Sequence, residues 1–293
     1  MGESGFPVVV IGASAGGVQA LMSLVEGLPV PFEAAVLIVL HIPPDFKSEL
    51  ATILQQVTSL RVVDAEDRAP LERGSIYVAA AGHHLLVTST SMRLTRTEKE
   101  ARSRPAIDAL FRSAADAFGR QAIGVVLSGM LTDGTSGLGA IKDQGGIALV
   151  QSDPCDTFAS MPENAAYHVD VDASAPVASL GPLIGQHVAR LASTQSSGNA
   201  IIRSGIGSSD ALRVPSTEAL LLDADNAIDR GLWGVLHAVD ERVVLLRRLA
   251  QQAKDGGSSD TAKAYLRQAE EAIVRSRSLR EMVTDSSLFG HAT

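Results

Sequence analysis

The sequence predicts an α/β protein: a doubly wound, mostly parallel sheet with helices on both faces and a small antiparallel meander, followed by a C-terminal α-helical hairpin. Two observations lead to this fold class. Short, uniformly apolar runs alternate with helical stretches over residues 7–193, as expected for buried parallel strands and the helices that cover them. From about residue 211 onward, apolar residues recur only at helical spacing.

The chain of 293 residues is long enough to bury a sizeable core, and its 45% hydrophobic and 20% charged residues are typical of a globular protein. A stretch rich in Ser and Gly over residues 194–209 indicates a linker. We therefore expect three parts: a domain over residues 1–193, a linker over 194–215 and a helical extension over 216–293.

Runs of β-branched and aliphatic residues indicate the strands of the main sheet. They lie at residues 8–11, 34–40, 61–63, 123–127 and 147–150. Three shorter runs are each flanked by Gly or Ser, which favours a small antiparallel meander. These runs are residues 76–78, 85–87 and 92–94.

Apolar residues spaced three and four apart indicate the helices that cover this sheet. The expected helices span about residues 15–27, 48–57, 105–118, 138–143 and 175–193. Pro105 suits the first turn of its helix, where a missing N–H costs nothing.

The charge balance argues against a nucleic-acid or anionic-membrane partner, because 25 Lys and Arg face 33 Asp and Glu. No apolar run reaches the length of a membrane span. We also expect no leader segment before the first strand. The single cysteine, Cys155, cannot form an internal disulfide. We expect a soluble, cytoplasmic protein without membrane insertion.

The chemistry is expected where the parallel strands end, because ligands bind at the carboxyl edge of such sheets. The first strand runs into Gly12-Ala13-Ser14-Ala15-Gly16, a Gly-x-Ser-x-Gly turn that leads into a helix. Such a turn exposes the serine hydroxyl at a helix N-terminus, where free N–H groups can stabilise an oxyanion.

A dinucleotide fingerprint is the competing interpretation of this turn, since Gly12-x-Ser14-x-x-Gly17 nearly matches Gly-x-Gly-x-x-Gly. Ser14, however, occupies the position where a glycine lets the backbone approach a pyrophosphate. The acidic residue expected after the second strand is replaced by His41. Both differences disfavour dinucleotide binding.

His41 and Asp133 complete a candidate nucleophilic site with Ser14. His41 directly follows the second strand, where it can act as general base toward Ser14. Asp133 lies beyond the strand at 123–127, and it can either form an ordinary Asp-Gly turn or hold the imidazole tautomer. The order Ser, His, Asp differs from that of the α/β-hydrolases.

At these positions the sequence resembles the chemotaxis protein-glutamate methylesterases (CheB). The shared motifs are IGASAGG at 11–17, HIP at 41–43, RPAIDALF at 104–111 and LSGMLTDG at 127–134, with shorter matches at 77–80, His84 and 161–162. Together they cover about residues 7–193, so the resemblance implies that this part is a methylesterase catalytic domain.

The resemblance implies a role for each matched residue. Ser14, His41 and Asp133 would be the catalytic triad. The backbone N–H groups of Met130 and Ala15 would form the oxyanion hole. The expected substrate-binding residues are Gly16, Gly17 and His84. The family usually has threonine at the position of Ala15, where a hydroxyl is absent here.

The implied substrate is a γ-glutamyl methyl ester on a helical chemoreceptor, and the implied second activity is deamidation of receptor glutamines. Neither a metal nor an organic cofactor is expected. Studied family members carry an N-terminal receiver domain that controls access to the site, and we expect a stand-alone form without it.

Two alternatives remain open at this point: a catalytically silent signalling adaptor of the same fold, and a hydrolase of other small esters. In the extension, apolar residues spaced three and four apart predict two helices joined by a turn at 254–259. This hairpin either packs only on itself or serves docking or self-association, because periodicity reports burial and not the partner.

Overall fold

The computed structural model describes residues 5–42, 48–100, 103–153, 158–197 and 258–288, together with single helical positions between 239 and 254. The only cysteine, Cys155, and the predicted linker from residue 198 lie outside the described residues.

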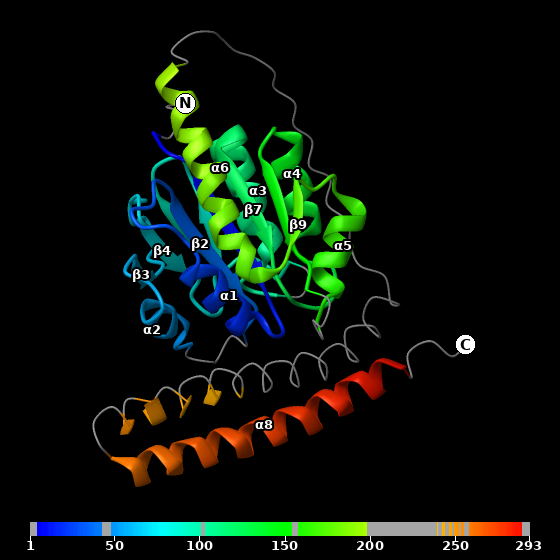
Figure 1. Cartoon of the computed structure of the whole chain (residues 1–293). Helices are drawn as coiled ribbons and strands as arrows, with labels where there is room; N and C mark the ends of the chain where they lie inside the picture. Colours follow the sequence, from blue (N-terminus) through cyan, green and yellow to red (C-terminus); the bar gives the residue numbers. More distant parts are fainter. Residues whose placement is uncertain are drawn as a thin grey trace.

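A seven-stranded sheet in the order β3-β4-β2-β1-β7-β8-β9 forms the centre of the α/β domain (Figure 1). All pairings in this sheet are parallel. Its strands are β1 (Val8–Ala13), β2 (Ala35–Leu40), β3 (Arg61–Asp64), β4 (Ser75–Val78), β7 (Ala122–Val126), β8 (Ile147–Gln151) and β9 (Ala173–Ala175). The strands β1, β2, β4, β7 and β8 are buried along their whole length, as parallel strands covered on both faces must be.

Helices cover both faces of the sheet. One face packs against α1 (Gly17–Glu26), α2 (Leu50–Gln55) and α6 (Val177–Ser197). The other packs against α3 (Ile107–Phe118), α4 (Thr135–Asp143) and α5 (Ser160–His168), and against the antiparallel pair β5 (His84–Val87) and β6 (Met92–Thr95). A short 3-10 helix, η1 (Gly119–Gln121), follows α3. In β1, Val9 and Ile11 face the first set of helices and Val8 and Val10 the second, because successive side chains alternate.

The predicted fold class is therefore confirmed, with one correction to its parts. Residues 76–78 were expected in the antiparallel meander, but β4 pairs in parallel with both β2 and β3. Its four residues are all buried, so this run is an interior strand of the main sheet. The antiparallel sheet consists of β5 and β6.

Some element boundaries also differ from the prediction. Pro105 precedes α3, which begins at Ile107 after Ala106 at the N-cap position. The helix α5 and the strand β9 were not predicted, because their sequences are short and weakly periodic. The helix α6 extends to Ser197, past residue 193 where the domain was expected to end.

Helices are also present in the C-terminal region, where α8 (Ser259–Leu288) is drawn in orange to red (Figure 1). Buried apolar residues occur both before and after the predicted turn: Val243, Leu246, Ala250, Ala262, Ala269 and Ala272. Among the residues described, no helix combines the length and the apolar character needed to cross a bilayer.

Candidate active site

Two predicted site residues follow neighbouring strands directly. Ser14 is the next residue after β1 and His41 the next after β2, and the last residues of these strands, Ala13 and Leu40, are paired in register. The His41 N–H donates to the carbonyl oxygen of Ala13 at 3.1 Å. β2 lies on one side of β1 and β7 on the other, so the order of the strands in the sheet reverses at β1. Open α/β sheets bind ligands at the carboxyl ends of the strands where this reversal occurs.

Gly16 and Gly17 shape the turn that presents Ser14. Gly16 is the N-cap residue of α1 and has φ of +73°, a left-handed conformation that favours glycine. A Cβ at Gly17 would lie 2.8 Å from the side chains of both Ala13 and Leu40. Both glycines are therefore required by the backbone, and their contact with substrate stays a prediction.

Ser14, His41 and Asp133 form one hydrogen-bonded chain. The Ser14 Oγ lies 3.3 Å from His41 Nδ1, and His41 Nε2 lies 2.7 Å from Asp133 Oδ2. The carboxylate of Asp133 can only accept, so Nε2 carries the proton and Nδ1 is left with a lone pair facing the serine hydroxyl. This tautomer is the one a general base toward Ser14 needs.

Asp133 is buried, with 3% of its side chain exposed, and lies at the N-terminus of α3. The N–H groups of Ile107 and Asp108 donate to its two oxygens, each at 2.9 Å. Burial alone would raise the pKa of Asp133, but the hydrogen bond and charge of His41 and these two N–H groups together hold that pKa below its ordinary value. The carboxylate therefore stays ionised beside the imidazole.

A segment after β7 closes the site on the side opposite His41. The Ser14 N–H donates to the Ser128 carbonyl oxygen at 2.9 Å, and the Gly129 N–H donates to the carbonyl oxygen of Phe158 at 2.8 Å. The Met161 N–H donates back to Gly129 at 3.1 Å. A Cβ at Gly129 would lie 2.6 Å from the Met161 side chain and 2.9 Å from Ser14 Cβ, so this segment packs tightly against the serine.

The backbone N–H groups of Met130 and Ala15 are available for an oxyanion. Within the part of the chain that the structure describes, neither donates to a protein acceptor. Met130 is followed by Leu131, which has φ of +69° and is 65% exposed. A non-glycine residue in this conformation is strained, and such strain is common at functional sites.

His84, predicted to bind substrate, is held on β5 by hydrogen bonds at both ring nitrogens. Its side chain is buried, with Nε2 2.9 Å from the Glu98 carbonyl oxygen and Nδ1 3.3 Å from the Ala106 nitrogen. It thus joins β5 to the residue that precedes α3. Its contact with substrate stays a prediction.

The comparisons with known proteins show which family the chain belongs to. The family model described as CheB methylesterase matches residues 9–184. The chain belongs to the CheB methylesterase family. The crystal structure of the CheB methylesterase catalytic domain from Thermotoga maritima is similar, with 29% identity and a TM-score of 0.59, over 62% of this chain and 98% of that one.

Curated relatives with protein-glutamate methylesterase names are similar in sequence over the α/β domain. A Leptospira interrogans protein is 34% identical over 168 residues, which are 57% of this chain and 87% of the relative. Proteins of Anaeromyxobacter dehalogenans and Nocardioides sp. are 39% and 37% identical over 58% and 64% of this chain; both are named protein-glutamate methylesterase/protein-glutamine glutaminase. The chain spans about half the length of these last two, at 50% and 52%.

Two further polar residues of the site were not predicted from the sequence. The buried Gln151 accepts the Ser128 N–H at 2.9 Å and donates to Asp153 at 2.8 Å, and Asp153 accepts the N–H of Val177 at the start of α6. Gln151 thus holds the residue whose carbonyl binds the Ser14 N–H. The other is Asp108, whose proximity to Asp133 no local pattern in the sequence reveals.

Proposed function

We propose that this CheB methylesterase-family chain hydrolyses γ-glutamyl methyl esters of a chemoreceptor, with Ser14 as nucleophile, His41 as general base and Asp133 as the group that orients His41. One observation carries the proposal: the hydrogen-bonded chain from Ser14 Oγ through His41 to the ionised Asp133. The names of the curated relatives support both the ester substrate and the deamidation of glutamine.

In the first half of the reaction, Ser14 Oγ attacks the ester carbonyl carbon while its proton moves to His41 Nδ1. Asp133 stabilises the imidazolium that forms, because its carboxylate already accepts the Nε2–H at 2.7 Å. The N–H groups of Met130 and Ala15 donate to the oxyanion, and one such donor lowers the barrier by about 3 kcal/mol. The C–O bond to the methyl group's oxygen then breaks, and methanol leaves with the proton from His41.

The second half uses the same groups in reverse. Water attacks the acyl-serine carbonyl and gives a proton to His41 Nδ1, which returns it to Ser14 Oγ as the ester bond to the enzyme breaks. The product is a glutamate side chain. With a glutamine substrate, ammonia replaces methanol as the leaving group and the acyl-serine intermediate is the same.

The names of the curated relatives, protein-glutamate methylesterase/protein-glutamine glutaminase, support a protein substrate rather than a free small ester. A methylated receptor helix is therefore the partner that we propose, docked across the carboxyl edge of the sheet. Use of the C-terminal helices in docking or self-association stays a prediction.

Release of methanol from radiomethylated receptor membranes tests this function. Wild type is expected to release methanol and Ser14→Ala to release none above background, because the variant lacks the attacking oxygen. Ser174→Ala, an exposed serine in β9, is the matched control and is expected to behave as wild type.

A parallel assay with p-nitrophenyl acetate separates the alternatives. Hydrolysis of this small ester without release of receptor methanol would indicate a hydrolase of other esters. If folded wild type turns over neither substrate, the chain is a silent adaptor and the proposed hydrolysis is wrong.

A further inference from the structure

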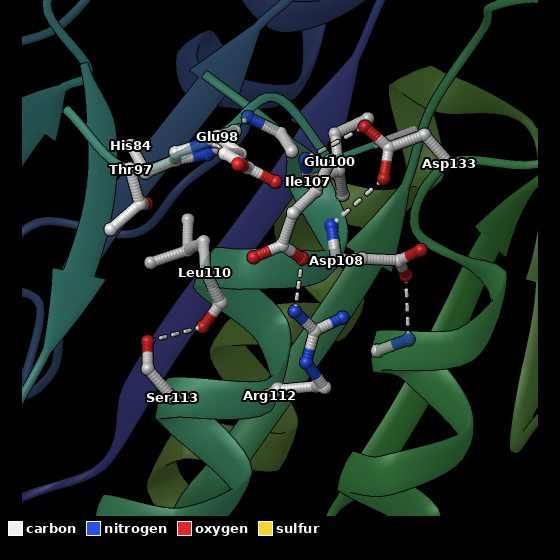
Figure 2. Close-up of polar contacts among 12 residues, drawn as sticks. His84, Thr97, Glu98, Glu100, Ile107, Asp108, Leu110, Arg112, Ser113 and Asp133 are labelled. Atoms are coloured by element: carbon white, nitrogen blue, oxygen red, sulfur yellow. Dashed lines mark hydrogen bonds and ion pairs between the residues drawn. The ribbon is translucent and has the colours of Figure 1, made fainter. Parts of the chain in front are cut away.

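The N-termini of α3 and α4 lie against each other beside the site, and each is capped by a carboxylate from the other segment (Figure 2). Their own N-cap residues, Ala106 and Gly134, make no side-chain cap. Four N–H groups at each helix start lack a partner within their own helix, so an acceptor must come from elsewhere.

Asp133, which directly precedes the N-cap of α4, accepts the Ile107 and Asp108 N–H groups of α3. Asp108, in the first turn of α3, accepts the N–H groups of Gly134 at 3.1 Å and Gly137 at 2.6 Å through its Oδ1. Side-chain oxygens that accept N–H groups at a helix N-terminus stabilise the start of the helix. The two carboxylates thus lock the two helices into one arrangement.

The two helices pack closely at Gly137, where a side chain would not fit. A Cβ at Gly137 would lie 2.5 Å from Phe111 Cβ and 3.0 Å from the Asp108 carbonyl oxygen. Gly134 has φ of +96° and immediately follows Asp133, so the bond from its N–H to Asp108 fixes the chain at the residue next to the triad carboxylate.

Asp108 is costly to keep ionised at this position. Burial and the negative charge of Asp133 raise its pKa to about 6, although the Gly137 N–H, the charge of Arg112 and the Gly134 N–H act in the opposite direction. Arg112 is itself paired with Glu100 (Figure 2). A carboxylate retained beside a second carboxylate suggests a use beyond stability.

We propose that Asp108 is a positioning residue of the esterase site, because its hydrogen bonds to Gly134 and Gly137 aim Asp133 at His41 and hold the segment that carries Met130. This inference rests on the proposed function. Asp108 touches neither His41 nor Ser14 in the described contacts, so it acts through the loop that it holds.

Kinetics of p-nitrophenyl acetate hydrolysis by the full chain test the proposal. Asp108→Ala is expected to lower kcat about 10- to 100-fold with KM changed less than about threefold, since a small shift of the triad affects the chemical step and not binding. Asp108→Asn keeps an oxygen that accepts both N–H groups, and it is expected to restore kcat to within about threefold of wild type. The matched control is Asp116→Ala, an exposed carboxylate on the same helix, with kcat unchanged.

Proton NMR gives a readout that does not depend on turnover. The His41 Nε2–H bonded to Asp133 is expected to give a downfield, slowly exchanging resonance, assigned by its loss in His41→Gln. This resonance is expected to persist in Asp108→Asn and to broaden or vanish in Asp108→Ala, while circular dichroism shows both variants to be folded. If wild type is inactive, the proposed function fails and the NMR comparison alone decides the role of Asp108.

Two results would overturn the proposal. One is an Asp108→Ala variant with the kcat and the imidazole resonance of wild type. The other is an Asp108→Asn variant that stays folded but loses as much kcat as Asp108→Ala, which would assign the effect to the charge and not to the hydrogen bonds.

Discussion

The two halves of the site are built in different ways. Ser14 and His41 each follow a strand of the sheet by one residue, and the register between β1 and β2 places them side by side. Asp133 and Met130 lie in a longer segment between β7 and α4, and this segment is held by contacts from distant parts of the chain. Ser14 and His41, the proposed nucleophile and base, are therefore positioned mainly by the sheet. Asp133 and Met130, the proposed orienting carboxylate and oxyanion donor, depend on tertiary hydrogen bonds.

The sharpest way to probe the second half is Asp133→Asn. The Asn side chain has an NH₂ group in place of one acceptor oxygen, so it no longer fixes the tautomer of His41 that has its proton on Nε2. This NH₂ group would also face the backbone N–H groups of Ile107 and Asp108, which need an acceptor. We expect kcat for p-nitrophenyl acetate to fall by about 10⁴-fold with little change in KM, the size of effect known for the corresponding change in a serine protease triad.

The comparison would be broken if Asp133→Asn retained more than about a tenth of wild-type kcat while folded. In that case His41 would keep its proton on Nε2 without Asp133, and activity would depend on Ser14 and His41 alone. Circular dichroism and the melting temperature of the variant provide the control for folding.

Gly129→Ala tests the segment without changing a polar group. The added Cβ would lie 2.6 Å from the Met161 side chain and 2.9 Å from Ser14 Cβ, so the segment must move away from the nucleophile. Because this displaces the Met130 N–H, we expect a 10²- to 10³-fold loss in kcat, about that of removing one oxyanion donor. Steady-state kinetics on p-nitrophenyl acetate measure it.

A useful control is Gly139→Ala, at a half-buried position of α4, where the nearest side-chain atom would be 3.9 Å from the new Cβ, an ordinary van der Waals contact. This variant is expected to keep wild-type kcat. Equal losses in both variants would mean that the effect comes from changes in the stability of the fold and not from the oxyanion donor.

The same difference explains how much of the site could be predicted from the sequence. Ser14 and His41 were recognisable because each follows an apolar run directly, and parallel strands bring their carboxyl ends to one edge. The backbone groups that hold Asp133 were not, since its carboxylate accepts the N–H groups of Ile107 and Asp108, 26 and 25 positions away. Local patterns contain no information about such contacts, so they do not reveal that Asp108 lies beside Asp133.

In the fold, too, local patterns predicted the elements but not the contacts between distant segments. The alternation of apolar runs with helices predicted the parallel sheet, but it did not distinguish β4 from the strands of a meander, because a short buried run has the same composition in both. The position of His84 was likewise beyond the sequence, since its hydrogen bonds to Glu98 and Ala106 arise only when β5 packs beside α3.

Ala15→Thr tests the sheet-positioned half, and here we expect the smallest effect. The backbone N–H of Ala15, and not its side chain, is the group that the proposed mechanism uses, and the residue is partly exposed. Threonine restores the residue usual in the family without disturbing the register between β1 and β2. Substitutions of surface residues typically change the free energy of unfolding by no more than about 0.5 kcal/mol. If the activation free energy changes by a similar amount, kcat on p-nitrophenyl acetate stays within about threefold of wild type. A tenfold or larger change in either direction would show that the turn after β1 also tunes the chemistry through its side chains, and the two halves of the site would then differ less than their construction implies.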